Sequence, residues 1–128
     1  MATTANYANT PRTAFVQVTT ANTNRDGTGT IATVITGGSS GSRVDDFSIV
    51  ATGTTTANVI RLFLNDGTNS RLLREIIVPA ITPSTTVPVF TASFVEQAIL
   101  LATSSWSLRA STNNAETYNI IVTRAGDF

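Results

Sequence analysis

The chain has 128 residues and a mass of 13.5 kDa, and its eight cationic and eight acidic side chains give a formal net charge of zero. All the cations are Arg, because the sequence contains no Lys, and it contains neither His nor Cys. These absences exclude disulfides, thiolate nucleophiles, Cys-based metal sites and the His or Lys base that normally activates a Ser nucleophile.

Charged residues make up only 12% of the chain, about half of the usual share of roughly 25%. The solvent face must therefore rely on Thr, Ser and Asn, or a partner must cover part of it. Phosphate binding needs clustered cations, and the chain has no basic run, so we expect no nucleic acid partner. No apolar run approaches the roughly 20 residues that span a bilayer, so we expect no membrane partner.

Residues 1–12 are polar, with Tyr7 as their only aromatic residue and Pro11 near their end. Two interpretations stay open for this segment. It is either an unstructured tail, or an arm that becomes ordered against a neighbouring chain. We assign residues 1–12 to an N-terminal arm and residues 13–128 to a single domain.

Short stretches rich in β-branched residues follow the arm, with Asn, Asp, Gly or Pro between them. We predict strands over residues 15–19, 30–36, 43–51, 58–64, 70–78, 87–94, 106–111 and 117–123. About eight strands at spacings of roughly ten residues are typical of an antiparallel sandwich or barrel. The predicted fold is therefore all-β, a single antiparallel β-sandwich that is jelly-roll-like.

Two hairpins are predicted. In the first, Asp66 and Gly67 lie between residues 58–64 and 70–78, and Asp-Gly between apolar runs favours a tight turn. The second would join residues 106–111 to residues 117–123.

Alternation within single strands predicts which side chains share a face. We expect Ile60, Leu62 and Leu64 on one face of their strand, and Arg61 and Phe63 on the other. In residues 43–51 we expect Phe47 and Ile49 to face away from Val44.

The apolar pattern of one segment fits both the period of a strand and the period of a helix. Residues 94–102 are compatible with a strand or with a single helical turn.

Residues that could carry chemistry are few. Asp45 and Asp46 are adjacent on a predicted strand, so they would point to opposite faces and could not flank one bond. The stretch from Asn22 to Gly27 is similar to a calcium loop, but Arg25 lies inside it and a plain turn is the better interpretation. We predict no catalytic, cofactor-binding or metal-binding residues.

Two aromatic residues, Trp106 and Tyr118, have alternative interpretations. They could form a platform on which a sugar or a base stacks. The more common role of such residues is to fill a sandwich core or a subunit interface.

Arg makes planar, paired hydrogen bonds to carboxylates and is favoured where charge is buried between chains. Four of the Arg residues, Arg61, Arg71, Arg74 and Arg109, lie on or beside predicted strands. An interface role is one explanation for them, and a genome that prefers Arg codons is the other.

Several stretches carry a resemblance to a known class of proteins. They are residues 51–68, 72–76, 108–118 and 126–128, together with the upstream residues 26–29. The chain resembles small virion-associated structural proteins of tailed bacteriophages, of the head decoration (cement) type. The resemblance covers most of residues 22–128, and its motifs mark turns and strands, with no catalytic site among them.

The resemblance implies a non-enzymatic protein, made in the cytoplasm of the host bacterium, that stands on the capsid exterior and stabilises the head. It implies a homo-oligomer, often a trimer, that binds the major capsid protein without a cofactor. The candidate contacts with the capsid or with other subunits are Tyr7, Arg12, Arg61 and Arg74.

Two alternatives stay open. The first is a tail or baseplate component with a receptor- or glycan-binding role. The second is a sugar-binding module that uses Trp106 or Tyr118.

Overall fold

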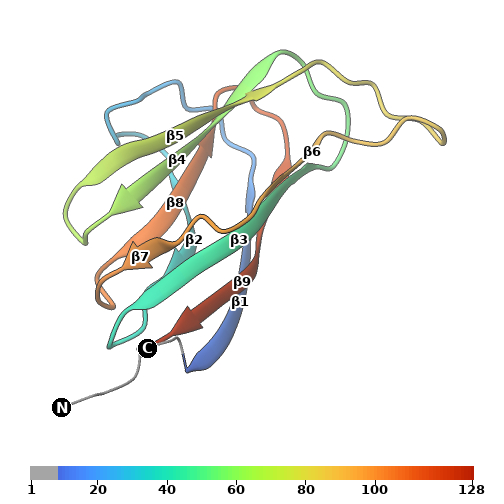
Figure 1. Ribbon diagram of the computed structural model, residues 1–128. Helices are drawn as coiled ribbons and strands as arrows, with labels where there is room; N and C mark the ends of the chain where they lie inside the picture. Colours follow the sequence, from blue (N-terminus) through green and yellow to red (C-terminus); the bar gives the residue numbers. More distant parts are fainter. Residues whose placement is uncertain (1–8) are drawn as a thin grey trace.

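The computed structural model describes residues 9–128 as two antiparallel sheets packed face to face (Figure 1). No helix occurs within these residues. The strands are β1 (Thr10–Val18), β2 (Ala32–Thr36), β3 (Ser42–Ala51), β4 (Asn58–Asn65), β5 (Ser70–Val78), β6 (Thr91–Phe94), β7 (Ile99–Leu101), β8 (Ser107–Thr112) and β9 (Tyr118–Asp127). The prediction of an all-β, sandwich-like fold is confirmed.

The first sheet has the strand order β1-β9-β3-β6, and β7 also pairs with β3. Strands β6 and β7 pair with successive parts of β3, at Phe47–Val50 and Ser42–Val44. These two short strands therefore share one edge of the first sheet. The second sheet has the order β2-β8-β4-β5, so that β2 and β5 form its two edges.

The hydrophobic core fills the space between the two sheets. Successive side chains of a strand point to opposite faces of the sheet, so every second residue points inward, and these residues are mostly apolar. The first sheet contributes the fully buried Phe47, Ile49, Ile120 and Val122, and the second contributes Ile60, Leu62 and Leu108. Burial of this kind is the main force that holds a sandwich together.

The predicted hairpin between β4 and β5 is confirmed, with antiparallel pairing from Asn58 opposite Val78 to Asn65 opposite Ser70. Asp66 Oδ1 accepts the backbone N–H groups of Thr68 and Asn69 at 2.9 and 2.8 Å. Gly67 takes a φ of 100°, a left-handed conformation that a residue without a Cβ adopts at little cost.

The second predicted hairpin is wrong. Strand β8 pairs with β2 and β4 in one sheet, whereas β9 pairs with β1 and β3 in the other. Residues 113–117 therefore carry the chain across the sandwich. Two strands that pair within one sheet and two strands that lie in opposite sheets show the same alternation of apolar and polar residues, because in both cases each strand turns one apolar face to the core. The sequence pattern therefore cannot distinguish the two arrangements.

The expected faces of residues 43–51 need a correction at Val44. This side chain is fully buried in the core together with Phe47, because the pairing of β3 with β9 shifts register on both sides of Asp46. An extra residue at such a β-bulge inverts the alternation beyond it.

Residues 94–102 contain no helical turn. They finish β6 and form β7, with a four-residue interruption at 95–98.

The beginning of the chain is placed in part. Strand β1 starts at Thr10, so residues 10–12, which we assigned to the arm, pair with the end of β9. Residues 1–8, and with them Tyr7, lie outside the described residues.

Candidate interaction surfaces

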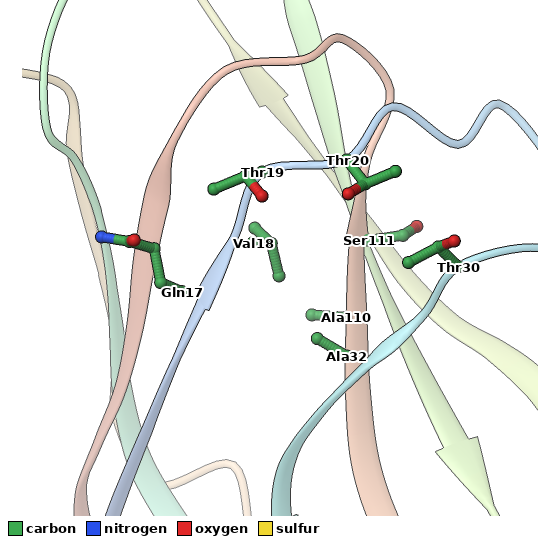
Figure 2. Close-up of a pocket in the computed structure, with 8 residues that line it drawn as sticks. All are labelled: Gln17, Val18, Thr19, Thr20, Thr30, Ala32, Ala110 and Ser111. Carbon is green, nitrogen blue, oxygen red and sulfur yellow. The ribbon is translucent and has the colours of Figure 1, made fainter.

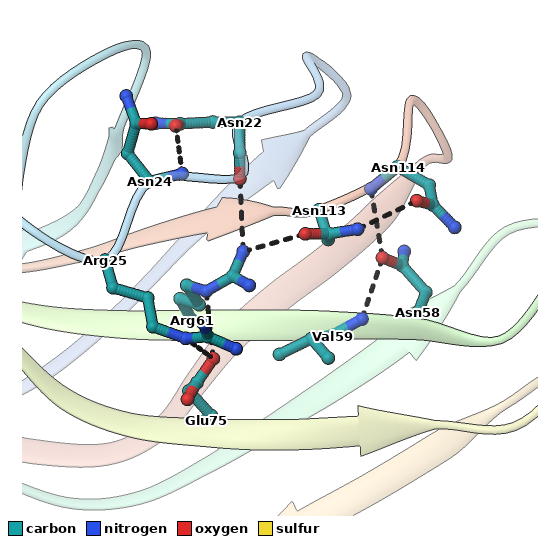
Figure 3. A network of polar contacts seen from close by, with 9 residues as sticks. All are labelled: Asn22, Asn24, Arg25, Asn58, Val59, Arg61, Glu75, Asn113 and Asn114. Atoms are coloured by element: carbon teal, nitrogen blue, oxygen red, sulfur yellow. Dashed lines mark hydrogen bonds and ion pairs between the residues drawn. The ribbon is translucent and has the colours of Figure 1, made fainter.

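Arg61 lies on the outer face of β4 and is only 3% exposed. Its Nε donates to Glu75 Oε2 at 3.0 Å, and its Nη1 donates to the carbonyl oxygen of Asn22 and to Asn113 Oδ1, both at 3.2 Å (Figure 3). A buried guanidinium is stable only when its donors are paired in this way. Arg61, a candidate interface residue, thus makes its contacts inside the protomer.

The connection between β1 and β2 covers this outer face. Asn22 donates its backbone N–H to Thr112 at 2.8 Å, and its side-chain amide donates to the carbonyl oxygens of Thr28 and Thr30, both at 3.0 Å. A Cβ at Gly27 would collide with the carbonyl oxygen of Ser70. The stretch that is similar to a calcium loop is therefore a cover for β4 and β8, and its Asn22 side chain is already used within it.

A second cation reaches the same carboxylate. Arg25 Nε donates to Glu75 Oε2 at 2.8 Å from the covering loop. The hydrogen bond from Arg25, with a smaller contribution from Arg61, lowers the pKa of Glu75 below its ordinary value. Glu75 stays ionised at neutral pH and ties the loop to the sheet.

Tyr118 is fully buried and joins a network between the sheets. Its hydroxyl accepts from Asn58 Nδ2 at 3.0 Å and donates to Glu116 Oε1 at 2.7 Å. Burial, together with the nearby Glu116 carboxylate, raises the pKa of Tyr118 to about 12. Tyr118 therefore belongs to the core, one of the two roles expected for it, while Trp106 packs half-buried against the same core.

A small cavity of about 80 Å³ lies where β1 and β2 diverge, lined by Gln17, Val18, Thr19, Thr20, Thr30, Ala32, Ala110 and Ser111. Figure 2 shows these side chains around it. Ser111 Oγ is buried there without a hydrogen-bond partner among the described residues. A space of this size, bordered in part by Thr and Ser hydroxyls, suits a few water molecules or one short polar side chain.

Arg12 joins three strands near the chain ends. Its Nη1 donates to the carbonyl oxygen of Thr36 at 2.6 Å and to Asp127 Oδ1 at 3.2 Å. The hydroxyl of Ser42, and then Arg12, lower the pKa of Asp127. The Arg12 side chain remains partly exposed, at 28%.

On one side of the sandwich, the edge of the second sheet is β5 and the edge of the first sheet is formed by β6 and β7. We call this side the open side, and Arg74 lies there on β5. Its Cζ lies 5.1 Å from the ring centroid of Phe94, a cation–π contact, and Phe94 stacks on Phe47 at 5.0 Å. A cavity of about 140 Å³ opens beneath this stack, lined by Phe47, Leu62, Leu73, Arg74, Gln97 and Ile99.

Between β6 and β7 the backbone is strained. Glu96 and Ala98 have φ angles of 54° and 50°, and a left-handed conformation costs a residue with a Cβ about 1–2 kcal/mol. Asp46 Oδ1 accepts the N–H of Glu96 at 2.9 Å, and Arg124 holds the Asp46 carboxylate with two hydrogen bonds of 3.0 Å. The kink turns Val95 and Glu96 out to solvent.

Apolar side chains remain exposed around the open side. Leu73 is 45% exposed, Leu100 is 55% exposed and Val95 is 63% exposed. A shallow apolar groove along residues 79–91 continues from the end of β5. Of the four candidate interface residues, Arg74 lies at this surface, whereas Arg12 lies on β1, at the opposite edge of the first sheet. Arg61 is buried under the β1–β2 connection, and Tyr7 is outside the described residues.

Comparisons with known proteins add no relative: no family model matches the chain, and no curated protein matches it. Within residues 9–128, no helix is both long and apolar enough to cross a membrane. The same residues contain no group of three or more His, Cys, Asp or Glu side chains placed to hold a metal ion.

Sequence reasoning missed the kink at Glu96 and Ala98. No Gly marks these two positions, so the local sequence carries no signal for a positive φ.

Proposed function

We propose that the chain is a non-enzymatic structural protein of a tailed-phage virion, which binds the outer capsid surface as a decoration protein. The observation that carries the proposal is the contrast between an interior in which buried charged groups such as Arg61 are paired and an open side with exposed apolar residues. Such a surface suits a protein that works in a permanent assembly, where a partner covers the apolar groups. The resemblance of residues 22–128 to decoration proteins agrees with it.

The finer fold that goes with this role is a jelly roll. Strand β1 pairs with β9, β2 with β8, β3 with both β6 and β7, and β4 with β5. If β6 and β7 count as one interrupted strand, this is the nested pairing of a long antiparallel ribbon wrapped into two sheets. The nesting supports a jelly roll of eight strands.

The carboxylates support a structural role. Asp46 pairs with Arg124, Glu75 pairs with Arg25 and Arg61, and Asp127 pairs with Arg12, while Asp45 pairs with Arg43. Glu116 accepts hydrogen bonds from Thr56 and Tyr118 at 2.5 and 2.7 Å. A general acid and base must reach a substrate, and these groups are already engaged in holding strands and loops together.

Attachment would be multivalent. A symmetric oligomer, a trimer by the resemblance, presents several copies of each weak contact to the major capsid protein, and avidity makes them strong together. Residues 1–8 with Tyr7, and the neighbouring Arg12, are the attachment elements that we propose.

The test is binding to undecorated heads of the phage that encodes the chain. Purified protein is mixed with heads, the heads are sedimented, and the bound copies are counted. We expect hundreds of copies per head, and we expect deletion of residues 2–8 to abolish binding while thermal unfolding stays unchanged. The deletion stops at residue 8 because residues 10–12 belong to β1.

No binding to heads would contradict the proposal. A few copies located on the tail would instead favour a tail or baseplate component. A glycan array that binds the protein would favour the receptor-binding alternative.

A further inference from the structure

The open side carries complementary charges on its two sheet edges. We propose that it is an interface between copies of this chain, in which the cationic β5 of one copy meets Glu96 of the next. The inference rests on the proposed homo-oligomer and names the surface that forms it.

Among the edge strands that the structure describes, β5 is the least protected. It has nine residues without an internal Pro, whereas β1 contains Pro11 and β2 has only five residues. Strands β6 and β7 are short and are separated by the kink. A long edge strand exposes a row of unpaired N–H and C=O groups, and in native proteins such an edge is normally covered.

Two cations on β5 form no ion pair within residues 9–128, although Arg71 donates to the carbonyl oxygen of Ser70 and helps to lower the pKa of Asp66. Arg74 is in register with Leu62 and Arg71 with Leu64, and directly paired residues point to the same face of a sheet. Both Arg side chains therefore lie on the face turned toward the other sheet. No ion pair joins either of them to a carboxylate within residues 9–128, and Arg74 donates no hydrogen bond there. A guanidinium fork of this kind matches a carboxylate.

The opposite edge offers that carboxylate. Glu96 is exposed and forms no ion pair with any described residue. Its backbone N–H is bound by Asp46, and its carboxylate helps to raise the pKa of Arg124, which is itself paired with Asp46. The strained φ of Glu96 is maintained by Asp46 and Arg124, and strain that is held in this way is typical of residues that meet a ligand or partner. Val95 and Leu100 add apolar surface beside it, as Leu73 does on β5.

Both edges belong to the same side of one sandwich. A contact from β5 of one copy to the kink of the next uses two different surfaces, and such heterologous contacts close into a ring when the rotation allows. If the copies are arranged around a common axis with their open sides turned toward it, each copy makes the same contact, from its β5 to the kink at Glu96 of the next copy. Three copies then give the proposed trimer.

Light scattering behind a sizing column tests the inference, with dilution to find the concentration at which half of the protein is assembled. We expect wild type to assemble. We expect Arg74→Glu and Glu96→Arg each to raise that concentration about tenfold or more, because like charges then face each other. The double variant should return it to within about threefold of wild type, since the reversed charges again attract.

Arg109→Glu is the matched control, because it makes the same charge change on β8, away from the open side, at an Arg that also has no ion-pair partner among the described residues. It should leave the assembly unchanged. Circular dichroism of each variant should match that of wild type. Arg74 and Glu96 are exposed, whereas Arg109 is half-buried and donates to Ser107 Oγ at 2.9 Å, so the spectrum of Arg109→Glu checks that the control is folded.

A monomeric wild type, or a double variant as weak as the single ones, would overturn the interface. The light-scattering measurements use no capsids, so a negative result in the head-binding assay would not contradict the proposed interface. Conversely, a wild type that decorates heads as a monomer would overturn this interface and leave the proposed function intact.

Discussion

The outer face of β4 and the open side of the sandwich treat Arg in opposite ways. Arg61 is buried under the β1–β2 connection, and Glu75, Asn22 and Asn113 bind its guanidinium. Arg74 lies on the adjacent strand in contact with one aromatic ring and with no carboxylate among the described residues. The difference teaches that two Arg residues on neighbouring strands can have opposite surroundings: Arg61 is paired within the protomer, whereas Arg74 has no carboxylate there and is the one for which we propose a partner.

The largest effect is expected at Arg61. Arg61→Met keeps the bulk of the side chain but leaves the buried Asn22 carbonyl and Asn113 amide without a donor. We expect the free energy of unfolding to fall by about 3 kcal/mol. Urea unfolding followed by circular dichroism measures it, and a loss below about 1 kcal/mol would show that the network contributes little.

A smaller effect is expected where the covering loop contacts the sheet. Gly27 has a φ of 89°, and a Cβ there would collide with Ser70. Gly27→Ala should lower the free energy of unfolding by about 2 kcal/mol. Gly53→Ala is the control, since no atom lies within 4 Å of its added Cβ, and should change stability by less than about 0.5 kcal/mol. Equal losses in the two variants would mean that the loop is not docked.

The interior network also predicts a response to alkali. The folded pKa of Tyr118, about 12, lies above the ordinary value of 10.0. The neutral phenol therefore stabilises the fold below pH 10, and this contribution is lost as the pH rises toward 12. Tyr118→Phe should remove this alkaline loss and, by leaving Asn58 and Glu116 short of a partner, lower stability at neutral pH by about 1 kcal/mol.

Phenolate absorbance during a pH titration reports both tyrosines of the chain, Tyr7 and Tyr118, so a Tyr7→Phe variant is used to follow Tyr118 alone. Its ionisation should coincide with unfolding. A Tyr118 that ionises near its ordinary pKa in folded protein would falsify the buried placement.

The smallest effect on stability is expected at the open side. Arg74→Met loses an exposed cation–π contact with Phe94, so we expect a loss of about 0.5 kcal/mol in the free energy of unfolding. The same substitution should weaken assembly. A loss comparable with that of Arg61→Met would remove the contrast between the two regions.

Local sequence predicted much of the fold. The β4–β5 hairpin follows from Asp66 and Gly67, which supply the turn, and from apolar runs of matched length on either side. The β8–β9 hairpin failed although its pattern was similar, because an inward-facing row such as Leu108 and Ala110 packs equally well beside a partner strand or across the core from one.

The candidate site was less predictable. Arg61 and Arg74 have the same chemistry and lie on similar strands, so sequence could not tell which one is covered. The covering loop decides this, through Asn22 and Arg25, which are more than thirty residues away from Arg61 in the chain.

By itself the sequence determined the class of the fold, the positions of most strands, and a narrow chemical repertoire without His, Cys or Lys, because these depend on residue type and on a period of two. Only the tertiary structure decided which strands pair, where β3 bulges, which Arg is buried, and that Glu96 is held in a left-handed conformation by Asp46. These features depend on contacts between distant residues, and local preference does not encode such contacts.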